Sequence, residues 1–100
     1  MKNVLEVSRG EFARAVKSFR LRSLSDAALL AFENGFLSVE SGEQLVTMRA
    51  TGEWHGRAWT SSNLLKALAA APPLEDPVVI VYTDGKLRIG STTIGCGGSW

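Results

Sequence analysis

This chain of 100 residues contains one cysteine and one histidine. Cys96 therefore has no partner for an internal disulfide, and together with His55 it cannot supply the ligands of a metal site. The acidic residues are dispersed without the spacing of a cation site. We expect no metal and no cofactor. An apolar fraction of 45% is sufficient for one globular domain held together by its own core.

Long apolar runs and a strong net charge are also missing. The sequence has neither a membrane span nor a signal peptide, so we expect a cytoplasmic protein that does not contact membranes. The net charge is only +1, but it is unevenly distributed. Residues 1–22 hold six basic and two acidic residues, whereas residues 23–100 hold five basic and eight acidic residues. This asymmetry indicates a polyanionic partner.

Two stretches fifty residues apart resemble each other. LLAFENGFLSVES begins at Leu29, and VIVYTDGKLRIGS begins at Val79. Each has a turn dipeptide, Asn34-Gly35 in the first and Asp84-Gly85 in the second, that accepts the positive φ angles of a tight hairpin turn. The sequence therefore predicts two similar β-hairpins.

A strand and a helix are expected before each hairpin. Ser8 and Glu11 form a capping box before a helix over residues 9–20, which has Phe12, Val16 and Phe19 on its buried face. The second helix begins at residues 60–62, carries Leu64, Leu65, Leu68 and Ala71 on one face, and is stopped by Pro72-Pro73. The remaining strands are expected at residues 2–7, at 44–54 with a twist or bulge at Gly52, at 56–60 and at 92–96, before a tail over 97–100.

The predicted order is strand, helix and three strands, written twice. We interpret residues 1–96 as one α+β domain with half-units of about 1–54 and 55–96 and with two helices packed on antiparallel sheets. Hairpins with these common turns also coincide by chance. The matching order of strand, capped helix, loop and hairpin favours an internal duplication.

This element order over the whole chain resembles one domain of the DNA sliding clamps, the processivity factors of DNA polymerases. In that family six domains close a ring around duplex DNA, with helices facing the hole and strands pairing edge to edge around the outside. The resemblance implies a homo-oligomer that encircles or cradles the DNA backbone without reading its sequence. Polymerases and other replication proteins are then candidate partners.

The resemblance also implies DNA-binding residues, which are basic side chains on the outward helix surfaces: Arg14, Lys17, Arg20, Arg22 and Lys66. The chain departs from the family in having one domain where clamp subunits have two or three. The second helix is weakly charged, and the sequence identifies no groove for polymerase tails. The cations of the first helix are equally consistent with an ordinary solvated helix surface.

The alternative function is a protein-interaction module that does not bind DNA and that uses exposed edge strands and Trp59. The tryptophans Trp54, Trp59 and Trp100, with His55 and Arg57 nearby, are consistent with a stacking platform for single-stranded nucleic acid, although packing or an oligomer contact is favoured. Cys96 and His55 are the only candidate nucleophile and base. No third, orienting group accompanies them, so we expect no enzymatic activity.

Overall fold

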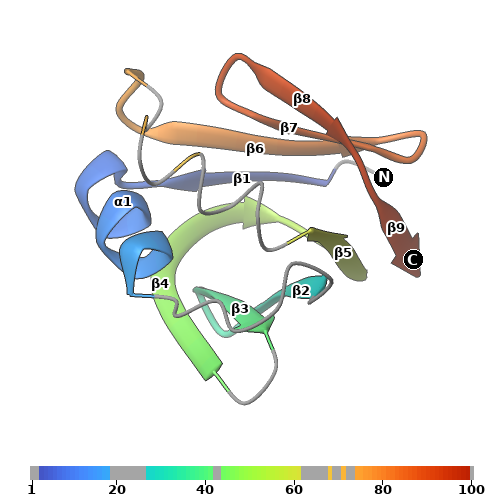
Figure 1. Ribbon diagram of the computed structural model, residues 1–100, viewed down its shortest axis with the longest axis horizontal. Helices are drawn as coiled ribbons and strands as arrows, with labels where there is room; N and C mark the ends of the chain where they lie inside the picture. Colours follow the sequence, from blue (N-terminus) through green and yellow to red (C-terminus); the bar gives the residue numbers. More distant parts are fainter. Residues whose placement is uncertain are drawn as a thin grey trace.

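The computed structural model describes residues 3–18, 27–41, 44–61, 68, 71 and 74–99. These residues contain one helix and nine strands with described bounds, in the order β1 (Val4–Val7), α1 (Arg9–Lys17), β2 (Ala27–Glu33), β3 (Phe36–Ser41), β4 (Gln44–Glu53), β5 (Arg57–Ser61), β6 (Val78–Thr83), β7 (Lys86–Ile89), β8 (Thr92–Gly95) and β9 (Gly97–Ser99) (Figure 1).

The expected α+β class with two helices is wrong. The described residues form mainly one antiparallel nine-stranded sheet in the order β8-β7-β6-β1-β4-β3-β2-β5-β9, accompanied by one short helix. The alternation of apolar and polar residues covers most of the chain, so strand pairing satisfies most of the backbone. The second expected helix lies outside the described residues except for Leu68, which is buried, and Ala71.

The two hairpins are confirmed, and their pairing registers are the same. Leu30 lies opposite Val39 in β2–β3, as Ile80 lies opposite Ile89 in β6–β7. Both turns take the positive φ angles that their Asn-Gly and Asp-Gly sequences favour, 53° and 81° at residues 34 and 35, and 49° and 75° at residues 84 and 85.

The repetition extends beyond the hairpins. β1 lies between β6 and β4, and β5 lies between β2 and the C-terminal strand β9. Leu5 of β1 pairs with Gly52, and Ala58 of β5 pairs with Gly98 in the equivalent register. The two halves of the chain are therefore built on the same strand pairings. β6 of the second half pairs with β1, the first strand of the first half, and β2 of the first half pairs with β5, the first strand of the second half.

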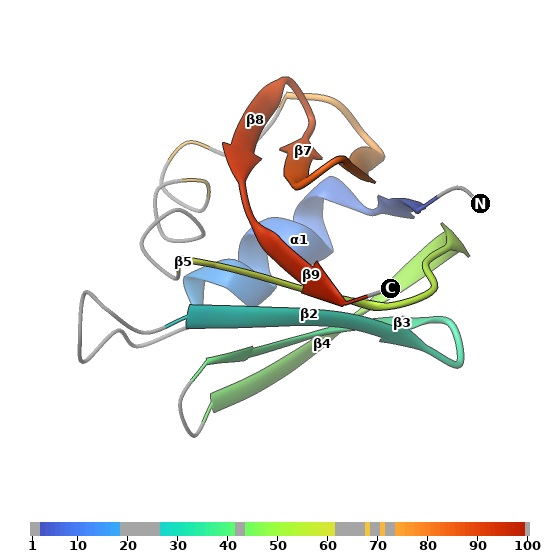
Figure 2. The same cartoon turned by 90° about the vertical axis from the view of Figure 1, so that its right-hand side faces the viewer.

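Residues 97–99, expected to be a tail, instead form β9 on β5, where Gly97 lies opposite Trp59. A Cβ at position 97 would overlap the indole ring of Trp59, so the glycine lets the strand run beneath that ring. Only Cys96 separates β8 from β9, and its N–H donates to the Gly85 carbonyl at 2.9 Å. The two ends of the sheet thus belong to consecutive chain segments, which run as one band in Figure 2.

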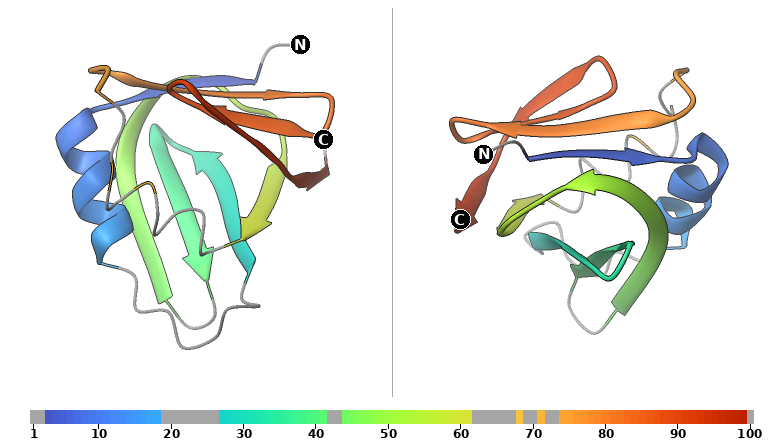
Figure 3. Two further views of the ribbon diagram at one scale, coloured as in Figure 1. Left: turned by 45° about the horizontal axis from the view of Figure 1, so that its top comes forward. Right: turned by 180° about the vertical axis from the view of Figure 1, so that it is seen from behind.

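The long β4 is strongly curved and passes beside α1 (Figure 3). Its curvature lets the inner sides of strands from both halves face one core, whose fully buried side chains include Leu5, Leu30, Leu37, Ile80, Leu87 and Ile89. No helix in the described part of the chain is long and apolar enough to cross a membrane.

Candidate nucleic-acid interface on helix α1

Helix α1 begins as the sequence predicts. Ser8 is the N-cap residue: its Oγ accepts from the Glu11 N–H at 3.5 Å, and its carbonyl accepts from the Phe12 N–H at 2.9 Å. Phe12 and Val16 are both 2% exposed and fix the inner face of the helix. The helix ends at Lys17, and residues 19 and 20 lie outside the described part.

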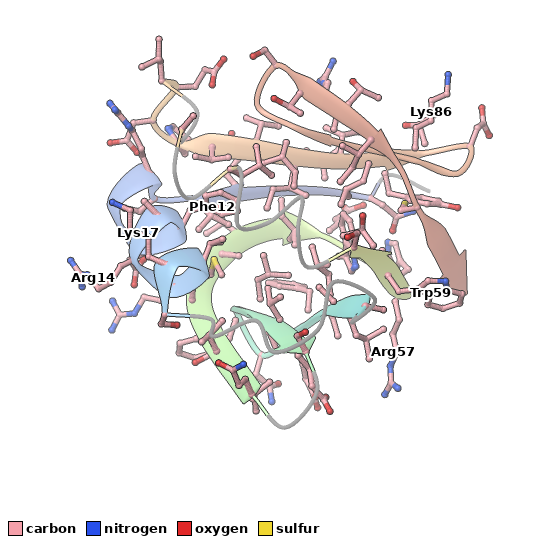
Figure 4. The ribbon with its side chains drawn as sticks, in the orientation of Figure 1. Phe12, Arg14, Lys17, Arg57, Trp59 and Lys86 are labelled. Carbon is pink, nitrogen blue, oxygen red and sulfur yellow. The ribbon has the colours of Figure 1, made fainter. Side chains whose placement is uncertain are left out.

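Because the Phe12 and Val16 face of the helix is buried, Arg14 and Lys17 point outward into the solvent. Both side chains are exposed, and Figure 4 shows them on the outer side of α1, with Phe12 on the inner side. They are three positions apart, so they are neighbours on the helix surface. Their place in the last turn also suits the helix dipole, which favours positive charge there.

Among the described residues, no carboxylate forms an ion pair with either cation. Glu11 is three positions before Arg14, but no ion pair joins them. The one contact between a basic and an acidic side chain within 4 Å in the described part of the chain lies elsewhere, between Nε2 of His55 and Oε2 of Glu53 at 3.8 Å. The charges of Arg14 and Lys17 are therefore available to an external anion.

The other three predicted DNA-binding residues, Arg20, Arg22 and Lys66, lie outside the described residues. The structure thus brings together two of the five, Arg14 and Lys17.

Further cations that the sequence reasoning did not select lie on β7. Lys86 and Arg88 alternate outward on the strand and border a shallow depression of about 560 Å³, which Thr83 and Thr93 also line. The alternation of basic and buried residues in KLRI is the signal that would have found them. Lys86 lies at the other end of the molecule from Arg14 in Figure 4, so this group forms a separate surface.

The tryptophans do not form a joint platform in the described structure. Trp54 is buried with 6% exposure, whereas Trp59 is 43% exposed on the outer face of β5 beside Arg57 (Figure 4). Trp100 lies outside the described residues. A nucleic-acid stacking surface needs several exposed rings along one path, and the described residues offer Trp59 alone from this set.

Cys96 and His55 are not joined by a hydrogen bond within the described structure. The main-chain N–H of His55 donates to Oδ1 of Asn3 at 2.9 Å, and its ring faces Glu53. Burial raises the pKa of the Cys96 thiol, whereas a nucleophilic cysteine requires a lowered pKa. The described residues also contain no cluster of three or more His, Cys, Asp or Glu side chains that could hold a metal.

Comparison of the chain with protein-family models, with curated proteins and with solved structures finds no match. Any function must therefore be argued from the residues themselves.

Proposed function

We propose that this chain is a non-catalytic protein that binds duplex DNA without sequence specificity and works as a homo-oligomer. The observation that carries the proposal is the outward surface of α1, where Arg14 and Lys17 are exposed and have no carboxylate partner among the residues that the structure describes. The excess of basic residues in residues 1–22 supports it. A cytoplasmic location is part of the proposal, because a lone cysteine such as Cys96 suits a reducing compartment.

Two helix cations suit phosphate contact rather than base reading. Sequence readout needs side chains that match base edges in a groove, and arginine and lysine on an open helix face provide only charge. Each phosphate that a cation neutralises changes the log–log salt slope of binding by about −0.9. Two contacts per subunit give weak binding alone, so an assembly that encircles or cradles the duplex is needed to retain it.

The sheet offers a surface on which copies can associate. Trp59, Leu29, Glu40 and Leu45 are directly opposite one another on adjacent strands and form an outer row across β5, β2, β3 and β4. Trp59 is 43% exposed and Leu45 is 61% exposed. Aromatic and aliphatic side chains that are exposed together on a sheet face are typical of a contact surface.

The test is binding to a labelled random-sequence duplex, measured by fluorescence anisotropy over a salt series. Arg14→Glu/Lys17→Glu should abolish binding. The matched control is Lys86→Glu/Arg88→Glu, which changes the net charge equally at a separate surface and should retain most of the affinity. Equal loss in both double variants would mean that only overall charge matters, and no binding by the wild type would exclude the function.

A second candidate function is a protein-interaction module that does not bind DNA, and the outer row favours it. In this case the row docks a different protein, with Trp59 as the central anchor. Trp59→Ala should then abolish partner capture while Arg14→Glu/Lys17→Glu leaves it intact. The native mass separates the two candidates, because the DNA-binding proposal requires an assembly and the module functions as a single copy.

A further inference from the structure

Part of β4 has an edge that no described strand covers. Residues 44–49 pair with β3 through one edge, whereas residues 50–53 pair with β1 through the opposite edge. Within the described part of the chain, residues 44–49 therefore have an open edge on the side away from β3. An open strand edge presents main-chain donors and acceptors that a further strand can use.

The alternation of main-chain hydrogen bonds along β4 identifies the residues whose N–H and C=O groups point to this open edge. The Ala50 N–H donates to the Gly35 carbonyl at 3.0 Å, which continues the β3–β4 ladder. In an antiparallel pair alternate residues bond to the same neighbour. Residues 44, 46 and 48 thus bond to β3, and the main-chain groups of Leu45, Thr47 and Arg49 point to the open edge.

Helix α1 flanks this edge across a groove. The α1–β4 groove has a volume of about 330 Å³ and is lined by Glu11, Arg14, Ala15, Ser18, Val46, Thr47 and Met48. Its base is apolar, because Ala15 and Met48 are buried and Val46 packs against the core. A helix on one side and an open strand edge on the other is an arrangement that accepts an extended peptide as an additional strand.

We propose that the α1–β4 groove binds an extended segment of a partner protein as an antiparallel strand on the open edge of β4. An apolar side chain of the segment occupies the groove above Val46 and Met48. A carboxylate of the segment pairs with Arg14, which forms no ion pair with any described residue. Glu11 also lines the groove, three positions before Arg14 on α1, and it sets the polarity because it repels an acidic residue placed beside it.

Charge complementarity favours a partner segment over a second copy of this chain. β8 and β9, the two end strands of the described sheet, have the sequences TTIG and GGS and carry no carboxylate for Arg14. The strand beside β8, β7, brings Lys86 and Arg88, which would add like charge near Arg14. The occupant is therefore an acidic segment that these end strands do not supply.

The experiment is selection from a random-peptide display library on the wild-type protein, followed by affinity measurement of the selected peptides. Thr47→Pro removes an N–H that points to the open edge and that folding does not use, so the sheet tolerates it. Thr93→Pro is the matched control: Thr93 faces Arg88 in β7 as Thr47 faces Ser38 in β3, and its N–H also points outward.

We expect selected peptides to combine strand-forming residues with an acidic residue. Thr47→Pro should lower their affinity about tenfold or more, since a main-chain hydrogen bond is lost and the ring obstructs the strand. Thr93→Pro should change it less than about twofold, within ordinary surface effects. Arg14→Gln should weaken acidic peptides, and Lys17→Gln should not, which separates this site from DNA binding.

Three results would overturn the inference. The first is a library that yields no binder, and the second is a set of peptides that Thr47→Pro and Thr93→Pro affect equally. The third is a wild-type assembly that Thr47→Pro dissociates and that the selected peptides do not disrupt, which would show that a second copy occupies the open edge. Circular dichroism and thermal melting confirm that each variant is folded.

Discussion

Replacement of Gly52 by alanine tests the packing of β1 on the curved strand β4. Gly52 has a φ of +132°, and a Cβ at this position would overlap the carbonyl oxygen of Val4 in the neighbouring strand. The nearest atoms are the carbonyl group of Val4 and Cα of Leu5. Because these atoms belong to the backbone, they cannot move aside as a flexible side chain would. The conformational strain alone costs about 1–3 kcal/mol, and the clash displaces the pairing of Leu5 with Gly52.

We expect Gly52→Ala to destabilise the fold by about 2 kcal/mol or more. In a domain of this size each kcal/mol lowers the melting temperature by about 4–8 °C, so the fall should be about 8–16 °C. Gly95→Ala is the control, because a Cβ at position 95 meets nothing within 4 Å. It should change stability by less than about 0.5 kcal/mol. Equal melting temperatures for the two variants in calorimetry would refute the predicted close approach of β1 and β4.

Other predictions concern the repeat, the helix and the thiol. Leu37→Ala and Leu87→Ala, both 0% exposed at equivalent places, should each cost about 2–5 kcal/mol in urea unfolding, with similar values for the two. Ser8→Ala should cost about 1 kcal/mol through loss of the helix cap, read as a lower melting temperature. Burial raises the pKa of the Cys96 thiol in the folded protein above the ordinary value of 9.0. The folded protein therefore keeps its full stability below pH 9.0 and loses part of it as the pH rises above this value, because the thiolate is favoured in the unfolded chain. Alkylation of Cys96 at neutral pH should accordingly be slower in the folded protein than in urea.

Features that depend on neighbouring residues were predictable from the sequence. The turns at Asn34-Gly35 and Asp84-Gly85 follow from the residues that tolerate positive φ. The start of α1 follows from the Ser8 cap, and the outward position of Arg14 follows from the helical period of the buried residues.

Features that depend on distant partners were not predictable. The glycine-rich segment 97–99 has no strand pattern, and it forms β9 by pairing with β5, where the missing side chain of Gly97 leaves room for the Trp59 ring. Whether β4 changes partner from β3 to β1 along its length cannot be read from alternation, because both pairings use the same period of two. The α1–β4 groove, which results from this change of partner, was therefore missed.

The most direct test of the proposed DNA contact is the salt dependence of duplex binding at a known subunit number. Wild-type protein and the Arg14→Gln/Lys17→Gln variant are compared by anisotropy, with the assembly mass determined under the same conditions. The account predicts that the variant's log–log slope is shallower by about 1.8 for each subunit that contacts the duplex, since two phosphate contacts are removed. An unchanged slope, or a wild type that is monomeric and shows no salt-sensitive binding, would contradict it.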